Sequence, residues 1–260
     1  MKTHIQSGDF TKLADVYSQY RPGYSPVVAR GLFRYVDIEQ EYFTAADIGA
    51  GTGIWSKYII ERNISCICVE PNEAMRKAGV EYTRAYGNVT WKSGSAEDTG
   101  LADHSVNWVT MASSFHWVDT EAGLREFRRI LKPGGYFTAL WNPRNIEGHA
   151  FHEEIEQMIY NMVPDLKRRS FGSKEHIENM NAVLTSTEDF TDVLFMEAPY
   201  TINRTPEEYI GAWRSVNDIQ AQAGPEKFEK IIDMISDRIK HMTFIPVPYI
   251  VRAWTAKAVE

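Results

Sequence analysis

Cysteine is scarce in this sequence, and that scarcity limits its chemistry. Only two of the 260 residues are cysteine, Cys66 and Cys68, and both stand in one apolar run. Side chains two apart lie on the same face of a strand, where they are poorly placed to form a disulfide. No further cysteine or histidine completes a metal motif. We therefore expect two small core residues in a reducing compartment, with no disulfide framework and no metal.

Long apolar runs are also lacking. No apolar stretch reaches ten residues, whereas a membrane-spanning helix needs about 20. The first ten residues are polar and do not resemble a signal peptide. These absences predict a soluble protein without a membrane partner, cytoplasmic by default.

Positive charge is not in excess. The chain has 28 Lys and Arg against 35 Asp and Glu, for a net charge of -7. Such a surface repels phosphate backbones and anionic lipids, so we expect no nucleic-acid partner. The composition, 43% hydrophobic and 24% charged, is that of a globular protein long enough to bury a full-sized core. Repeats and low-complexity segments are missing too.

What is present is an alternation of short strand-like and helical patterns. Strands are predicted at 45–49, 64–70, 89–92, 106–112 and 136–141, with helices at 54–62, 72–86 and 120–131 between them. Such βαβ units indicate a doubly wound, mostly parallel sheet. Beyond Pro143 the rhythm changes. Helical patterns follow at 151–162, from Thr205 and at 228–239, and strands at 194–202 and 249–258 bring the sheet to seven.

The most informative segment is Asp47-Ile48-Gly49-Ala50-Gly51-Thr52-Gly53, between the first strand and the first helix. Glycines there let a ligand approach the backbone, and Glu70, about twenty positions later, can bind two ribose hydroxyls. The pattern predicts a nucleoside-containing cofactor. It leaves open a nicotinamide cofactor, S-adenosylmethionine, or a plain tight turn. Ile54 stands where the dinucleotide fingerprint has its last glycine or alanine, which disfavours the nicotinamide.

Five segments in order resemble class I S-adenosylmethionine-dependent methyltransferases. They are the glycine segment, Val69-Glu70-Pro71-Asn72-Glu73-Ala74-Met75, Gly94-Ser95-Ala96-Glu97, Ala112-Ser113-Ser114-Phe115-His116-Trp117 and Leu131-Lys132-Pro133-Gly134-Gly135-Tyr136-Phe137. The segment 115–117 and the start 17–24 are similar to the trans-aconitate methyltransferase type. The resemblance implies an α/β Rossmann-like core at 41–143 and 190–260, an N-terminal helical flap at 1–40 and an inserted helical lid at 144–189. Helices within 205–242 would also roof the substrate pocket.

The resemblance also implies a cofactor site. Gly49 and Gly51 would pack on the methionine portion, Glu70 would hold the ribose, and Met75 would cover the adenine. Asp47 would steer the ammonium, directly or through water, and Arg21 would pair with the carboxylate. The expected cofactor-binding residues are Tyr20, Arg21, Asp47, Gly49, Ala50, Gly51, Glu70, Pro71, Met75, Ser95, Ala96, Glu97 and Ala112.

His116 is the candidate catalytic residue, because it has the chemistry of a base near neutral pH. It is either that base or a satisfied structural histidine. An ionised carboxylate needs no base, whereas an alcohol or a phenol does. Expected substrate contacts are His116, Trp141, Asn142, Trp213, Arg214 and Tyr249.

The sequence thus predicts transfer of a methyl group from S-adenosylmethionine to a small molecule by in-line displacement, leaving S-adenosylhomocysteine. An oxygen of a carboxylate, phenol or hydroxyl is the preferred acceptor, and nitrogen is an alternative. Other hypotheses are a nicotinamide-dependent oxidoreductase and a non-catalytic module that binds S-adenosylmethionine. The protein would be a monomer or a homodimer. We also expect 167–169 to be an exposed loop, and His149 and His152 to be exposed helix residues rather than metal ligands.

Overall fold

The structure is a computed structural model, and it describes residues 9–39, 41–168 and 174–259. The chain divides into two compact units, each built from three segments. The first unit contains Met1–Pro22, Arg144–Ser170 and Pro199–Ile250, and the second contains Gly23–Pro143, Phe171–Ala198 and Val251–Glu260. The predicted division into flap, core and lid stays a prediction.

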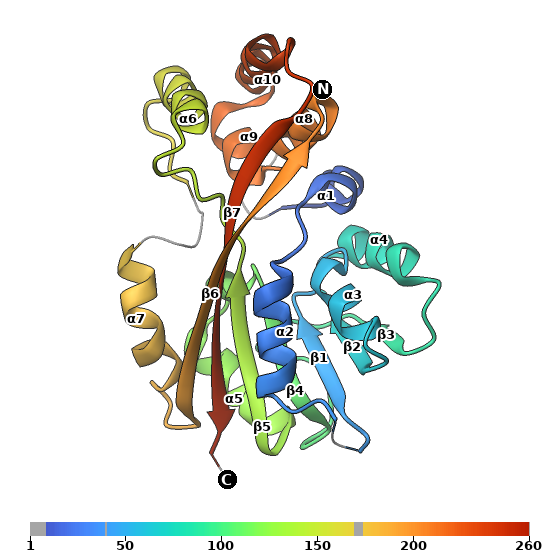
Figure 1. Cartoon of the computed structure of the whole chain (residues 1–260). Coiled ribbons are helices and arrows are strands. Elements are labelled where there is room, and N and C mark those ends of the chain that lie inside the picture. The colour runs from blue at the N-terminus through green and yellow to red at the C-terminus, as the bar shows by residue number, and fades with distance from the viewer. Residues whose placement is uncertain (1–8, 40, 169–173, 260) are drawn as a thin grey trace. The chain divides into compact units, whose positions relative to one another are not determined.

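A seven-stranded sheet with the order β3-β2-β1-β4-β5-β7-β6 organises the described residues (Figure 1). Its strands are β1 (Thr44–Ile48), β2 (Ser65–Val69), β3 (Val89–Lys92), β4 (Val106–Ala112), β5 (Leu131–Trp141), β6 (Phe190–Arg204) and β7 (Ile245–Ala258). The first five pair in parallel, whereas β7 runs antiparallel to β5, with Tyr136 opposite Lys257. The seven strands agree with the sequence prediction, and the sheet is mixed.

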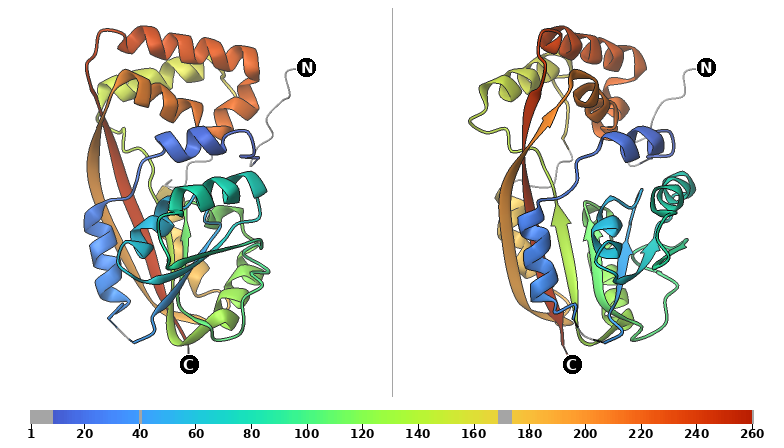
Figure 2. Two further views of the ribbon diagram at one scale, coloured as in Figure 1. Left: turned by 90° about the vertical axis from the view of Figure 1, so that its right-hand side faces the viewer. Right: turned by 45° about the vertical axis from the view of Figure 1, so that its right-hand side comes forward.

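Helices cover both faces of this sheet in the second unit. They are α2 (Pro26–Tyr35), α3 (Ile54–Ile60), α4 (Glu73–Thr83), α5 (Thr120–Ile130), α7 (Lys174–Leu184) and the short 3-10 helix η1 (Phe115–Trp117). Trp108 of β4 meets Phe33 of α2 edge-on, with the ring centroids 5.4 Å apart. The next residue, Val109, belongs to a buried cluster with Phe127 of α5. Because successive strand residues point to opposite faces, α2 and α5 lie on opposite sides of the sheet (Figure 2).

The core between these layers is apolar and close-packed. Cys66 and Cys68 are both buried free thiols with their sulfurs 3.9 Å apart, which confirms their prediction as core residues. Larger side chains fill the space under α5, where Phe127 and Phe137 pack with ring centroids 4.7 Å apart. This burial stabilises the strand ends that carry the glycine turn.

The first unit is mainly helical. It holds α1 (Ala14–Tyr20), α6 (Ala150–Met162), α8 (Pro206–Arg214), α9 (Asn217–Ala223) and α10 (Pro225–Ile239), together with one end each of β6 and β7. A capping box begins α8: the Thr205 hydroxyl accepts from the Glu208 backbone, and the Glu208 carboxylate accepts from the Thr205 backbone. This start was predicted from the sequence. Apolar faces of α6, α8, α9 and α10 share a second buried cluster.

Within the described ranges no helix is both long and apolar enough to cross a bilayer.

Candidate functional site

The glycine turn joins β1 to α3 and is tied to the neighbouring strand. Gly49 and Ala50 both donate their backbone N–H to the carbonyl of Val69 at the end of β2, at 2.8 and 3.1 Å. Gly49 has φ 63 and Gly51 has φ 58, a left-handed backbone that glycine adopts without strain. A Cβ on Gly49 would lie 2.9 Å from the Ser114 side chain. The turn therefore needs glycine both for its conformation and for its packing.

Glu70 fastens the glycine turn to the start of α4. Its Oε2 accepts from the Gly51 backbone at 2.8 Å, and its Oε1 accepts from the Asn72 backbone at 2.8 Å. Burial raises the pKa of this carboxyl, and the two backbone donors oppose that shift. Each oxygen has a second lone pair, so the carboxylate can accept further bonds from hydroxyl groups.

Asp47 lies beneath the turn. Its carboxyl has no exposed surface. Oδ2 accepts from the Ser56 hydroxyl at 2.5 Å, and Oδ1 accepts from the Thr110 hydroxyl at 3.0 Å. Burial raises the pKa of Asp47 to about 7, although both hydroxyl bonds lower it. Asp47 thus supports the turn from inside, and its role toward a cofactor ammonium stays a prediction.

Residues of the predicted adenine side lie on α4 and on the loop after β3. Met75 and Ala96 are buried, and the methyl group of Met75 lies 3.4 Å from where a Cβ of Gly51 would be. Glu97 is exposed, and its Oε1 accepts from the backbone of Asp119 at 3.0 Å. Other residues named for the cofactor share this part of the second unit: Ser95 donates its backbone N–H to Asp98, Pro71 follows Glu70, and Ala112 ends β4.

His116 and Trp141 are in direct contact. The Trp141 indole N–H donates to Nδ1 of His116 at 3.2 Å. Trp141 is buried at the end of β5, and its neighbour Asn142 donates its side-chain N–H to the Gly23 carbonyl at 2.6 Å. Three of the predicted substrate residues therefore lie together within the second unit.

The turn between β4 and η1 holds His116 beside the glycine turn. Ser114 donates its hydroxyl to the Ile48 carbonyl at 3.2 Å. Ser113, with φ 58, donates its backbone N–H to Leu140 at 2.7 Å, and its hydroxyl lies 3.2 Å from the Tyr24 hydroxyl. Sequence reasoning did not single out Ser113, Ser114 or Tyr24, although all three stand in segments that carried the family resemblance.

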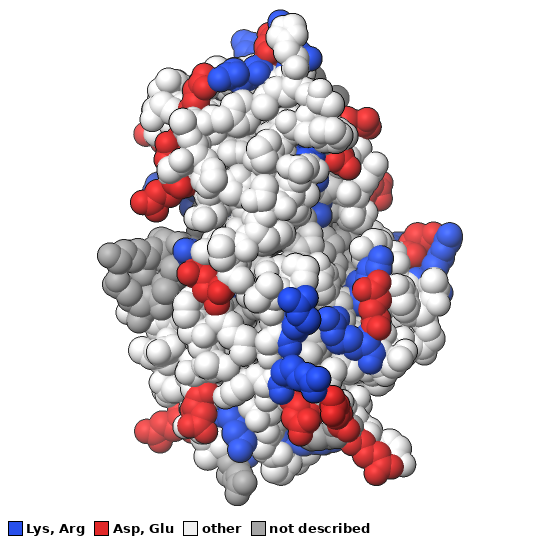
Figure 3. Space-filling model, in the orientation of Figure 1, with Lys and Arg blue, Asp and Glu red and all other residues white. Residues whose placement is uncertain are grey.

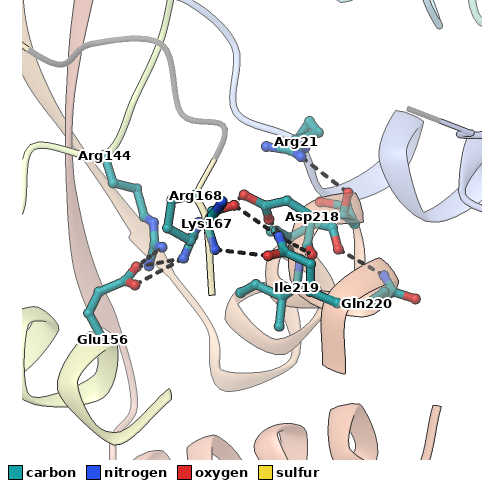
Figure 4. Close-up of polar contacts among 11 residues, drawn as sticks. Arg21, Arg144, Glu156, Lys167, Arg168, Asp218, Ile219 and Gln220 are labelled. Carbon is teal, nitrogen blue, oxygen red and sulfur yellow. Dashed lines mark hydrogen bonds and ion pairs between the residues drawn. The ribbon is translucent and has the colours of Figure 1, made fainter. Parts of the chain in front are cut away.

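The remaining predicted cofactor residues, Tyr20 and Arg21, lie in the first unit. The Tyr20 ring packs so closely on Gly211 that a Cβ there would lie 2.4 Å from it. Arg21 donates from Nη2 to the Ser215 carbonyl at 3.1 Å (Figure 4). Its Nε is buried with no hydrogen-bond partner among the described residues. A carboxylate would satisfy that nitrogen, but the predicted contacts of both residues with a cofactor stay predictions.

The predicted substrate residues of the first unit differ in exposure. Arg214 makes a two-pronged ion pair with Glu229 at 2.8 Å, with more than a third of each side chain exposed. Trp213 and Tyr249 are buried. The Arg144 guanidinium lies 4.0 Å from the centroid of the Trp213 ring. The structure therefore places Trp213 and Tyr249 in the interior of this unit and Arg214 in a surface ion pair.

The expectation of an exposed loop at 167–169 is wrong for Arg168. Arg168 binds Glu156 of α6 at 2.9 Å and Asp218 of α9 at 3.2 Å, with 17% of its side chain exposed. Arg144 binds the same Glu156 carboxylate (Figure 4). The partner carboxylates lie on α6 and α9, 12 and 50 residues from Arg168, and local polarity does not reveal them. Arg169 lies outside the described residues.

The expectation for His152 is also wrong. His152 is buried rather than exposed on α6. Its Nε2 lies 2.8 Å from the Pro246 carbonyl, and its Nδ1 lies 3.2 Å from the Tyr209 hydroxyl. Burial lowers its pKa. These partners come from α8 and β7. Among the described side chains no group of three or more His, Cys, Asp or Glu is arranged to hold a metal ion.

Comparison with known proteins places this site in a family context. Residues 46–139 match a family model described as a methyltransferase domain. An uncharacterized methyltransferase of Mycobacterium tuberculosis is 31% identical over 139 residues, covering 52% of this chain and 53% of the relative. The match thus spans about half the length of that relative.

Solved structures share the fold over nearly the whole chain. A proposed type II methyltransferase from Anaeromyxobacter dehalogenans superposes with a TM-score of 0.59 at 21% identity, covering 92% of this chain and 98% of that one. A phosphoethanolamine N-methyltransferase from Haemonchus contortus has a TM-score of 0.56 at 13% identity, covering 96% of this chain and 57% of that one. That protein was solved in complex with S-adenosylhomocysteine. At these identities the likeness establishes the Rossmann-like methyltransferase fold.

Proposed function

We propose that this chain is an S-adenosylmethionine-dependent methyltransferase that acts on a small molecule. The observation that carries the proposal is the bond from the Gly51 backbone to Glu70 at the carboxyl ends of β1 and β2. The strand order reverses at β1, which pairs with both β2 and β4. In open α/β sheets, ligands bind in the crevice at such a switch point.

The residues at this crevice suit an adenosyl cofactor. The carboxylate of Glu70 can accept from the two ribose hydroxyls, and the bare backbone at Gly51 admits close approach. Met75 supplies a polarisable apolar surface beside the turn. Pro71, Ser95, Ala96, Glu97 and Ala112 complete the proposed cofactor site of this unit, and Tyr20 and Arg21 are proposed to bind the methionine portion. S-adenosylmethionine supplies an electrophilic methyl group on a positively charged sulfur.

The protein's own task is then to hold an acceptor atom in line with that methyl group. Fixing two reacting atoms in line provides much of the rate in such a reaction. His116, Trp141 and Asn142 form the acceptor side in the second unit, and Trp213, Arg214 and Tyr249 are proposed contacts from the first. An oxygen acceptor is the first choice. Nitrogen is the alternative, because a structural relative is named a phosphoethanolamine N-methyltransferase.

We further propose that the enzyme is of the trans-aconitate methyltransferase type. It would be a cytoplasmic monomer or homodimer without nucleic-acid partners. A nicotinamide-dependent oxidoreductase is the competing hypothesis from the glycine turn. The second competing hypothesis is a module that binds S-adenosylmethionine without catalysis. These readings differ in which ligand binds and in whether methyl transfer follows.

Calorimetric titration with S-adenosylmethionine, S-adenosylhomocysteine and NADH tests the proposal. We expect both adenosyl ligands to bind and NADH not to bind. Glu70→Ala should weaken adenosyl binding roughly 100-fold, because two charge-assisted hydrogen bonds are worth about 1.5–3 kcal/mol each before compensation. Glu73→Ala is the matched control, since Glu73 is an exposed glutamate that pairs with Lys77 on α4.

The acceptor is then sought with radiolabelled S-adenosylmethionine and a panel of carboxylic acids, phenols, alcohols and amines. Adenosyl binding without transfer to any of them would favour the non-catalytic module. NADH binding in place of adenosyl binding would overturn the proposal. A Glu70→Ala variant that binds as tightly as the wild type would remove Glu70 from the site.

A further inference from the structure

Hydrogen bonds of the neighbouring residues fix the backbone around His116. Its short helix η1 begins after Ser114, whose hydroxyl donates to the Ile48 carbonyl of β1. Ser113 is held by β5 through Leu140, and the backbone N–H of Trp117 donates to the Ser114 carbonyl at 3.0 Å. The turn is thus attached to the strands on both sides of β4. The backbone that carries the imidazole therefore has a defined position at the carboxyl end of β4.

The partner of the imidazole is equally constrained. Trp141 is 2% exposed and ends β5. Its ring packs edge-on against Trp254, with the ring centroids 5.7 Å apart. The tilted ring of Phe115 lies on a further side, with its centroid 6.5 Å from that of Trp141. An indole in such packing cannot turn its N–H toward another acceptor without displacing core side chains. The N–H points at Nδ1 of His116 from a fixed place.

The direction of this hydrogen bond determines the tautomer of His116. An indole nitrogen only donates, so Nδ1 must accept through its lone pair and carries no proton. The single proton of the neutral ring is therefore on Nε2. To act as a base, this ring would have to take a proton on Nδ1, where it would face the indole N–H. Protonation of His116 thus breaks the bond to Trp141.

We propose that His116 serves methyl transfer as a hydrogen-bond donor through Nε2–H and not as a general base, and that Trp141 is the positioning residue that fixes this tautomer. This inference rests on the proposed methyltransferase function. It excludes the general base, one of the two roles that the sequence leaves open for His116, and assigns the imidazole a role that the sequence analysis did not name. An acceptor served by such a donor arrives already ionised, or loses its proton to a group other than His116.

Nitrogen NMR of the ¹⁵N-labelled full chain tests the tautomer directly and needs no substrate. We expect His116 to show an unprotonated Nδ1 and a protonated Nε2, with the signals assigned by their loss in His116→Gln. His104 is an internal reference for the opposite tautomer. Its Nδ1 lies 2.8 Å from the Leu131 carbonyl, which can only accept, so His104 carries its proton on Nδ1.

Trp141→Phe keeps an aromatic ring and removes the donor. We expect His116 in this variant to show a mixture of the two tautomers. Trp108→Phe is the matched control, because Trp108 is also a buried indole but donates to the Thr138 hydroxyl. A wild-type His116 with its proton on Nδ1 would overturn the proposal. An unchanged pure tautomer in Trp141→Phe would remove Trp141 as the positioning residue.

The donor role is tested on an acceptor from the radiolabel panel. Glutamine offers an N–H near the place of Nε2 but cannot take up a proton. We expect His116→Gln to stay within about tenfold of the wild-type rate, whereas His116→Ala falls roughly 100- to 1,000-fold. Equal losses in the two variants would establish a base and overturn the proposal. Adenosyl binding measured by calorimetry separates this outcome from failure of the proposed function, which would abolish binding in the wild type as well.

Discussion

At the scale of single residues, Asp47 combines a predicted motif position with complete burial. Its carboxyl accepts hydrogen bonds from Ser56 and Thr110 and has no exposed surface. Desolvation raises its pKa from 3.8 to about 7. Between these two values the unfolded chain ionises Asp47 while the folded chain keeps it protonated. Asp47 therefore imposes a stability cost that is absent below pH 3.8, grows as the pH rises and is complete above about pH 7.

Asp47→Asn should remove this pH dependence. The amide keeps an acceptor for Ser56 and cannot ionise. Relative to the variant, we expect the wild type to lose stability from pH 4.5 to 7.5, with a limit of about 4 kcal/mol for a shift of about 3 pKa units. Urea unfolding across this range measures the difference. Asp98→Asn, the same substitution at an exposed aspartate, is the matched control. A constant difference between wild type and Asp47→Asn would contradict the buried, protonated carboxyl.

The same residue shows what sequence can and cannot reveal. The motif located Asp47, Gly51 and Glu70 at one turn, because strand, glycine spacing and acidic partner are all local patterns. It did not show that Ser56 and Thr110 occupy both oxygens of Asp47. Those partners come from α3 and β4, and only the assembled sheet brings them together. Local patterns thus predict where a site lies, whereas tertiary contacts decide what each side chain does there.

At the scale of secondary-structure elements, a buried charge cluster joins α6, α9 and the segment before α7. Glu156 is its centre, because it binds both Arg144 and Arg168 and is 12% exposed. Removing one partner from a buried ion pair leaves a charge without compensation, which costs about 3–5 kcal/mol. Arg168 retains Asp218 in that case, so the loss falls mainly on Arg144.

Glu156→Gln should therefore destabilise the protein by about 3 kcal/mol in urea unfolding. Glu154 offers a matched control on the same helix, since it pairs with Arg238 at the surface, with 48% of its side chain exposed. Glu154→Gln should cost much less stability than Glu156→Gln, because water screens the exposed pair. Raising the salt concentration should weaken the surface pair more than the buried one. Equal effects of the two substitutions would show that the cluster around Glu156 is hydrated.

Elements with a clear period were the easiest to predict. The strand 89–92 and the strand 106–112 have the predicted bounds, and the capped start of α8 at Thr205 is present. The strand predicted at 136–141 begins earlier, at Leu131, because Leu131 pairs with Val106 across an irregularity in the register. The sequence Lys132-Pro133-Gly134-Gly135 looks like a turn, and the parallel neighbour β4 overrides that preference. The short helix α9 was not predicted, since its polar residues show no apolar stripe.

At the scale of the whole molecule, the excess of acidic residues predicted an absence of nucleic-acid partners. Figure 3 shows Asp and Glu beside Lys and Arg on the face that it displays. Among the described residues, exposed charges form ion pairs, such as Arg34 with Glu39 and Arg125 with Glu121. A surface of interspersed charge with a net charge of -7 gives little attraction for a polyanion. The composition therefore gives no support for a polyanionic acceptor in the proposed reaction.

Ligand binding should stabilise the whole chain in a way that depends on one carboxylate. A ligand that binds only the folded state adds about 2.7 kcal/mol at 100 times its dissociation constant. For a chain of this size we expect S-adenosylhomocysteine to raise the unfolding temperature by roughly 5–10 °C. Calorimetry with and without the ligand measures the shift. In Glu70→Ala, whose binding we expect to be about 100-fold weaker, the shift at the same concentration should fall to roughly 1 °C.

Hydrogen exchange locates the origin of that stabilisation. S-adenosylhomocysteine should slow exchange at 49–53 and at 70–75, because Glu70 connects these two backbone segments through Gly51 and Asn72. The start of α8, whose capping box lies in the first unit, serves as the reference segment for exchange that does not depend on Glu70. A thermal shift of wild-type size in Glu70→Ala would place the ligand elsewhere in the chain. If Glu70→Ala loses most of the thermal shift and also the protection at 49–53, the Glu70 carboxylate accounts for cofactor binding, for the order of the glycine turn and for the gain in stability.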